Sequence, residues 1–221
     1  MTRSDSAAKH LFARIDRAAM IAGLNPRLGL LRDEVRNHLA EALEQEALNI
    51  QNAKESQYCE SLDGKTIIIE CSRGGSDGMA MPLKGTFGYQ YALANYCPEI
   101  LENAAILYIW VTPEESRRKN RARYNPDDPG SNLNHMTPES VMLYDYGCDD
   151  MLYLRETSDI PDTVTVQSHG MTYHLPIGVF DNRKDMTTFL RGNSAQWDPV
   201  LLKQATAAVH AATDTMWERY R

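Results

Sequence analysis

Apolar residues in the first 60 positions recur at the spacing of a helix. Leu11, Ile15 and Ala18 share one face, and Leu31 with Leu39 belongs to a second, longer series. A break is expected at residues 23–26, where glycine can close the first helix and proline can open the second. We therefore expect an N-terminal helical segment over residues 1–60.

From residue 61 onwards, short apolar runs alternate with helical patterns. This alternation favours an α/β fold in which helices cover both faces of a parallel sheet, with ligands at the carboxyl ends of the strands. We expect this core over residues 61–221. Core strands are predicted at Thr66–Glu70, Ala104–Val111 and Pro176–Phe180, with a strand pair at Thr163–Val166 and Met171–His174.

A basic helix is predicted directly after the second core strand. Thr112 to Glu115 have the threonine cap, N1 proline and N3 glutamate of a helix start. Arg117 and Arg121 then share a face, and guanidinium groups can grip phosphate oxygens in pairs. The alternative is a solvated face on which Glu114 pairs with Arg118.

A glycine-rich segment follows the first predicted strand. Glu70 could supply a carboxylate for metal or proton chemistry, and the amides around Gly74 and Gly75 could face an anion. The alternative is a flexible turn in which Glu70 pairs with an arginine.

Two further polar groups could hold Mg²⁺ through oxygen ligands. One is Asp149 with Asp150, and the other is the pair Asp181 and Asn182 at the end of the last core strand. Helix capping explains the aspartates equally well.

Composition limits the cellular compartments and the binding partners that we expect for this protein. The net charge of −7 and the isoelectric point near 5.4 argue against binding nucleic acid through overall charge, so any polyanion must meet a local site. No stretch reaches the length of a membrane span and no secretory signal is visible, so we expect a cytoplasmic protein that does not bind membranes. The four cysteines form no CxxC pair, and we expect reduced, mostly buried thiols.

The order of elements over roughly residues 30 to 215 resembles P-loop kinases of the nucleoside and nucleotide kinase type. Residues 70–73 are similar to that family's acidic strand end, and residues 108–123 to a strand entering an arginine-rich lid, here expected at about 113–135. The chain departs from the family where the Walker A loop should be. Gly64-Lys65-Thr66 does not supply it, because it precedes a predicted strand and not a helix.

The resemblance implies ATP and Mg²⁺ as cofactors, with the lid arginines clamping the transferring phosphates and Glu70 assisting Mg²⁺ or the acceptor hydroxyl. Glu70 and Asp149 with Asp150 are the expected metal ligands. The expected catalytic residues are Glu70, Arg73, Arg117 and Arg121, and the expected nucleotide-binding residues are Ser72, Gly74, Gly75, Arg118, Arg123, Asp181 and Asn182.

Three hypotheses about function follow. The leading one is a kinase-like phosphotransferase or nucleotide-binding protein acting on a phosphorylated or hydroxyl-bearing substrate. The second is a non-catalytic protein whose basic helix docks an anionic partner, nucleic acid being the less favoured choice. The third is a metal-dependent hydrolase built on Glu70, Asp149 and Asp150. Homo-oligomerisation is compatible with all three.

Overall fold

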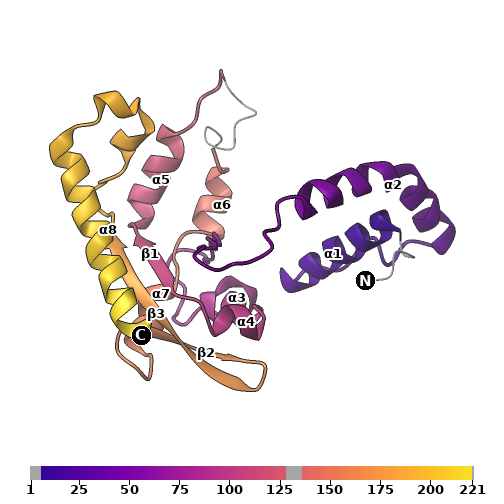
Figure 1. Ribbon diagram of the computed structural model, residues 1–221, viewed down its shortest axis with the longest axis horizontal. Coiled ribbons are helices and arrows are strands. Elements are labelled where there is room, and N and C mark those ends of the chain that lie inside the picture. The colour runs from indigo at the N-terminus through magenta and orange to yellow at the C-terminus, as the bar shows by residue number, and fades with distance from the viewer. Residues whose placement is uncertain (1–5, 128–135, 221) are drawn as a thin grey trace. The chain divides into compact units, whose positions relative to one another are not determined.

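The computed structural model describes residues 6–127 and 136–220. The chain divides into two compact units, Met1–Glu70 and Cys71–Arg221. The first is helical, and the second combines helices with a small sheet (Figure 1).

The first unit is a pair of helices, α1 (Ala7–Ile21) and α2 (Asp33–Glu55). The prediction of two helices is confirmed, although the second begins at Asp33 and Pro26 lies in the connection. Small side chains let the two helices approach closely. The buried residues of this contact are Ala7, Ala8, Phe12, Ala40 and Ala47.

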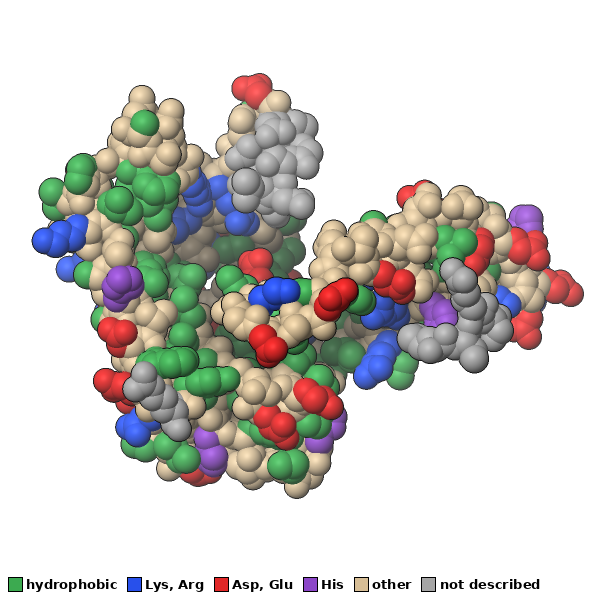
Figure 2. Space-filling view, in the orientation of Figure 1, with side chains coloured by type: hydrophobic (Ala, Val, Ile, Leu, Met, Phe, Trp, Pro, Cys, Tyr) green, Lys and Arg blue, Asp and Glu red, His purple; other side chains and the backbone are tan. Residues whose placement is uncertain are grey.

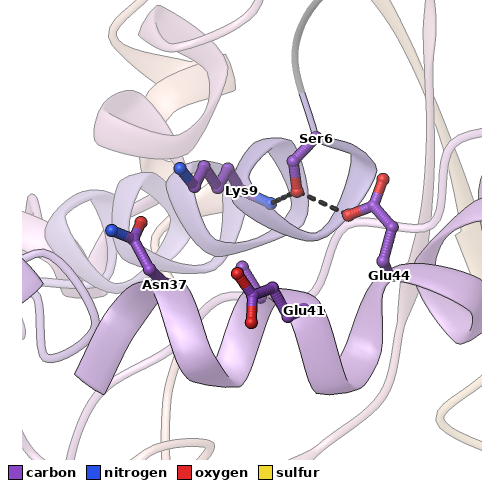
Figure 3. Close-up of a pocket in the computed structure, with 6 residues that line it drawn as sticks. Ser6, Lys9, Asn37, Glu41 and Glu44 are labelled. Carbon is purple, nitrogen blue, oxygen red and sulfur yellow. Dashed lines mark hydrogen bonds between the residues drawn. The ribbon is translucent and has the colours of Figure 1, made fainter. Parts of the chain in front are cut away.

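Carboxylates close both ends of this helix pair. Glu44 of α2 accepts hydrogen bonds from Ser6 Oγ (2.5 Å) and from the amides of Ala7 (2.8 Å) and Ala8 (3.1 Å), beside an open groove of 520 Å³ (Figure 3). These bonds hold the pKa of Glu44 below its usual value. At the other end, Asp16 accepts from the backbone amides of residues 27–29.

The first predicted core strand is not a strand. Thr66–Glu70 pairs with no described strand, and Ile67, Ile68 and Ile69 are 65%, 89% and 47% exposed. A β-branched run favours extended backbone, but a strand forms only where a neighbour supplies hydrogen-bond partners. The prediction that the sheet begins here is therefore wrong.

The second unit contains a mixed sheet in the order β1-β3-β2. β1 (Ile106–Trp110) runs parallel to β3 (Met171–Asp181), and β2 (Thr163–Ser168) pairs antiparallel with β3 through a turn at His169–Gly170. The expected α/β class is thus confirmed. The expected all-parallel sheet is wrong, because the predicted hairpin joins the same sheet through β3.

Helices cover both faces of the sheet. On one face α8 (Pro199–Tyr220) packs against β3, where a Cβ on Gly178 would lie 1.9 Å from the Ala212 carbonyl oxygen. The opposite face packs against α3 (Tyr89–Ala94), α4 (Pro98–Leu101) and α7 (Met151–Glu156) (Figure 1). Leu175 and Ile177 lie at the centre of that core and are 2% and 0% exposed.

The basic helix α5 (Pro113–Ala122) begins as predicted, with Thr112 Oγ1 accepting from the Glu115 amide at 3.2 Å. It is followed by α6 (Glu139–Tyr144). The described residues of this unit also form three short 3₁₀ helices, η1 (Gly85–Phe87), η2 (Thr188–Arg191) and η3 (Ser194–Gln196).

Two expectations from composition bear on the surface. Within residues 6–127 and 136–220, no helix has the length and apolar character needed to cross a bilayer. All four cysteines are free, but Cys59 and Cys97 are exposed, so the expectation of mostly buried thiols is wrong for these two.

Candidate functional site

One face of α5 carries cations whose charges are matched within the protein. Arg118 Nη2 lies 2.6 Å from both Glu115 Oε1 and Asp185 Oδ2, and Lys119 Nζ lies 3.0 Å from Asp185 Oδ1. The hydrogen bond from Arg118 is the largest influence on Glu115 and lowers the pKa of that carboxyl. Arg118, expected to hold a nucleotide, thus has two acidic partners already.

The neighbouring face is formed by Arg117 and Asn120 of α5 and by Arg123, the residue that caps its C-terminus, which are spaced three residues apart. Asn120 is 3% exposed and makes a reciprocal pair with Thr137, donating to its carbonyl oxygen (2.8 Å) and accepting from its amide (2.9 Å). Arg123 Nη2 donates to Asn120 Oδ1 (3.0 Å) and Thr137 Oγ1 (3.3 Å). We call Arg117, Asn120, Arg123 and Thr137 the Arg117–Arg123 face.

This face holds buried donors that lack acceptors. Among the described residues, Arg117 Nη1 and Arg123 Nε are buried and make no hydrogen bond. Within the part of the chain that the structure describes, Arg117 pairs with the carboxylate of Glu114, which lies 3.6 Å away and whose side chain is 76% exposed. Buried polar groups in folded proteins are nearly always hydrogen-bonded, so these two donors require an explanation.

Lys119 Nζ also lacks hydrogen-bond geometry, but Asp185 matches its charge at 3.0 Å. Figure 2 shows Lys and Arg side chains gathered over α5. The two arginine donors on the Arg117–Arg123 face therefore distinguish it from the paired face beside it.

Arg121, predicted to act jointly with Arg117, contacts a different element. Its Nη1 lies 3.1 Å from Glu139 Oε1 of α6, and both side chains are about half exposed. Exposed pairs of this kind contribute little to stability. The rest of the predicted lid, residues 128–135, lies outside the described residues.

At the carboxyl end of β3, the two residues predicted to bind a nucleotide have internal partners. Asp181 receives two hydrogen bonds from the side chain of Arg183 (2.9 and 2.7 Å), which lower its pKa to about 2. Arg183 stacks on Trp110 at 3.7 Å. Asn182 is 4% exposed and closes a turn, donating to Thr187 Oγ1 and accepting from the Met186 amide.

The glycine-rich segment packs against backbone. The Gly75 amide donates to the Cys148 carbonyl oxygen (2.9 Å), so the prediction that this amide faces an anion is wrong. A Cβ on Gly74 would lie 2.7 Å from two carbonyl oxygens, which explains the requirement for glycine. Ser72 is exposed, Arg73 is half-buried, and Glu70 is an exposed residue of the first unit.

Asp149 and Asp150 contact tyrosines and backbone amides. Asp149 Oδ2 accepts from Tyr108 Oη (2.8 Å), and the fully buried Asp150 accepts from the amides of Leu83 (3.1 Å) and Tyr89 (3.0 Å). Burial raises the pKa of Asp150. Over the described part of the chain, no three His, Cys, Asp or Glu side chains form a group able to hold a metal ion.

Sequence reasoning missed Asn120 and Thr137, which organise the Arg117–Arg123 face. The available indication was that Asn120 is the one uncharged residue between Arg117 and Arg121. Its partner lies 17 positions away, beyond the reach of a local pattern.

Comparisons of this chain with protein-family models, with curated proteins and with solved structures found no match. The function is therefore inferred from the geometry of the site.

Proposed function

We propose that the unit Cys71–Arg221 binds a phosphate-bearing molecule, with Arg117 of α5 and Arg123 at the C-terminal end of that helix holding one phosphoryl group. The observation that carries this proposal is the pair of buried guanidinium donors without acceptors. A bound phosphoryl group would supply acceptors for these donors and remove the cost of leaving them unpaired.

The arrangement favours an anion over a neutral ligand. The carboxylate paired with Arg117, that of Glu114, lies 3.6 Å away and is 76% exposed, whereas Arg118 and Lys119 on the adjacent face share Asp185. Arg123 is held in place by Asn120 and Thr137, so little side-chain freedom is lost when it binds. A rigid, partly uncompensated guanidinium group suits the tetrahedral oxygens of phosphate.

A nucleotide is the phosphate-bearing ligand that we put forward first, with Mg²⁺ bound through the phosphates. Kinase-like phosphotransfer would require this binding step, so one experiment addresses both. If the partner is instead an anionic surface docked by α5, affinity will fall with added salt and will not depend on nucleotide identity.

The test is thermal unfolding of the full chain with ATP, with pyrophosphate and with inorganic phosphate, each with and without Mg²⁺ at constant ionic strength. A ligand present at 100 times its dissociation constant stabilises the folded state by about 2.7 kcal/mol. We expect Arg117→Met to weaken binding about 10-fold or more, because one charge-assisted hydrogen bond contributes roughly 1.5–3 kcal/mol.

Two features separate this expectation from a general charge effect. Without ligand, Arg117→Met should be as stable as the wild type or more so, because it removes an unpaired buried donor. Arg219→Gln removes the same charge from the C-terminal end of α8 and should bind like the wild type. Equal loss in both variants, or no stabilisation by any of the three anions, would refute the proposal.

A further inference from the structure

The two edge strands of the sheet, β2 and β1, differ in the hydrogen bonds that their outer edges receive. On β2, the Gln90 side-chain amide of α3, oriented to satisfy both groups, donates to the Thr165 carbonyl oxygen (3.1 Å) and accepts from the Gln167 amide (3.3 Å). Ser168 Oγ also donates to the Ala94 carbonyl oxygen at 2.5 Å. This edge is covered by α3, which prevents further strand pairing there.

No hydrogen bond from the described residues reaches the outer edge of β1. β1 pairs with β3 on one side, where the Trp110 carbonyl oxygen accepts from the Asn182 amide at 2.9 Å. Backbone groups alternate in direction along a strand, so those of Leu107 and Ile109 point to the other edge. These residues are 41% and 53% exposed.

The sequence of β1 lacks the features that protect a free edge. Its five residues, Ile106 to Trp110, include no charged residue, proline or glycine. Natural edge strands commonly use lysine, proline or a bulge to prevent pairing with another chain. An uncharged edge can meet a copy of itself without bringing like charges together.

The register of such a strand pair is self-complementary. In an antiparallel pair related by a two-fold axis at Tyr108, Leu107 lies opposite Ile109 of the second copy, and the converse pair follows by symmetry. Both are hydrogen-bonded positions, because their backbone groups point outward. The pairing therefore satisfies the free N–H and C=O groups of both residues.

Side chains beside the edge would enlarge the contact. Leu107 and Ile109 lie on the face covered by α8, because they are in register with Gly178 and Phe180. Tyr220 of α8 donates to the Asn103 carbonyl oxygen (3.4 Å) just before β1 and stacks with Trp217. Trp217 and Tyr220 are 54% and 43% exposed, and large aromatic residues often dominate interface energies.

We propose that two copies of this chain associate through the free edges of β1, forming one continuous sheet across a two-fold axis. The occupant of the edge is β1 of the second copy. The proposal is independent of phosphate binding, because none of its residues belongs to the Arg117–Arg123 face.

The first test is sedimentation equilibrium of the full chain over a micromolar concentration range. We expect a reversible dimer that Ile109→Lys weakens about 100-fold, because each interface loses two buried apolar side chains and gains two charges. Ile68→Lys is the matched control, since Ile68 is 89% exposed and lies outside the sheet, and it should dimerise like the wild type.

A second test remains informative if Ile109→Lys fails to fold. Leu107→Cys and Ile109→Cys are made separately, each with the exposed Cys59 and Cys97 replaced by serine. Oxidation to a disulfide should cross-link the mixture of the two variants far more than either alone, because residue 107 faces residue 109 of the other copy and a disulfide does not reach diagonal neighbours about 7–8 Å apart. A monomeric wild type, a dimer unaffected by Ile109→Lys, or equal cross-linking in all samples would overturn the proposal.

Discussion

Asp150 offers a direct test of whether a buried carboxylate stabilises the fold. Its side chain is fully buried and accepts from the amides of Leu83 and Tyr89. Asp150→Ala leaves both donors unpaired, and each buried unpaired donor costs roughly 1–3 kcal/mol. Removing the carboxylate also removes its desolvation cost, which the raised pKa of Asp150 reveals.

The two unpaired donors together cost about 2–6 kcal/mol. Because the lost desolvation cost offsets part of this, we expect Asp150→Ala to lower the free energy of unfolding by about 3 kcal/mol. For a unit of this size the melting temperature should fall by roughly 6–12 °C. Asp150→Asn keeps one acceptor and should lose less. Urea denaturation followed by circular dichroism measures both changes.

Asp145→Ala is the control, because Asp145 is exposed and lies in the same segment. It should change stability by less than about 0.5 kcal/mol. If Asp150→Ala were equally harmless, the structural role would be refuted. If Mg²⁺ stabilised the wild type but not Asp150→Ala, the predicted metal site would be supported instead.

Two further predictions concern packing and pH. Gly178→Ala should lower the free energy of unfolding, measured by urea denaturation, by about 1–3 kcal/mol. The added Cβ would lie 1.9 Å from the Ala212 carbonyl oxygen, whereas ordinary contacts are at least 3.4 Å. A variant as stable as the wild type would contradict this prediction. Burial raises the pKa of Asp185, but hydrogen bonds from Thr188 and the charge of Lys119 outweigh it and leave the pKa below its usual value. Asp185→Asn should therefore be less stable than the wild type at neutral pH, with a difference that shrinks as pH falls below about 4; a constant difference would contradict this.

The sequence predicted correctly those elements that depend on residues close together in the chain. The start of α5 at Thr112 and the turn at His169–Gly170 are examples, because cap and turn residues act over a few positions. Thr66–Glu70 failed for the opposite reason, since a strand depends on a distant partner. The roles of Asp150 and Asn120 were likewise hidden, because their partners are 61 and 17 positions away.

The carboxylates of the helix pair bind main-chain groups more than particular side chains. Glu44 and Asp16 bind main-chain amides, at residues 7–8 and 27–29, and every residue except proline offers the same amide. These hydrogen bonds therefore do not depend on which side chains stand at these positions, although helix packing keeps Ala7 and Ala8 small and a Cβ on Gly29 would lie 3.0 Å from Asp16. Two acidic residues thus hold the helix pair through main-chain amides, and the same two contacts could be designed into another helical hairpin of similar geometry.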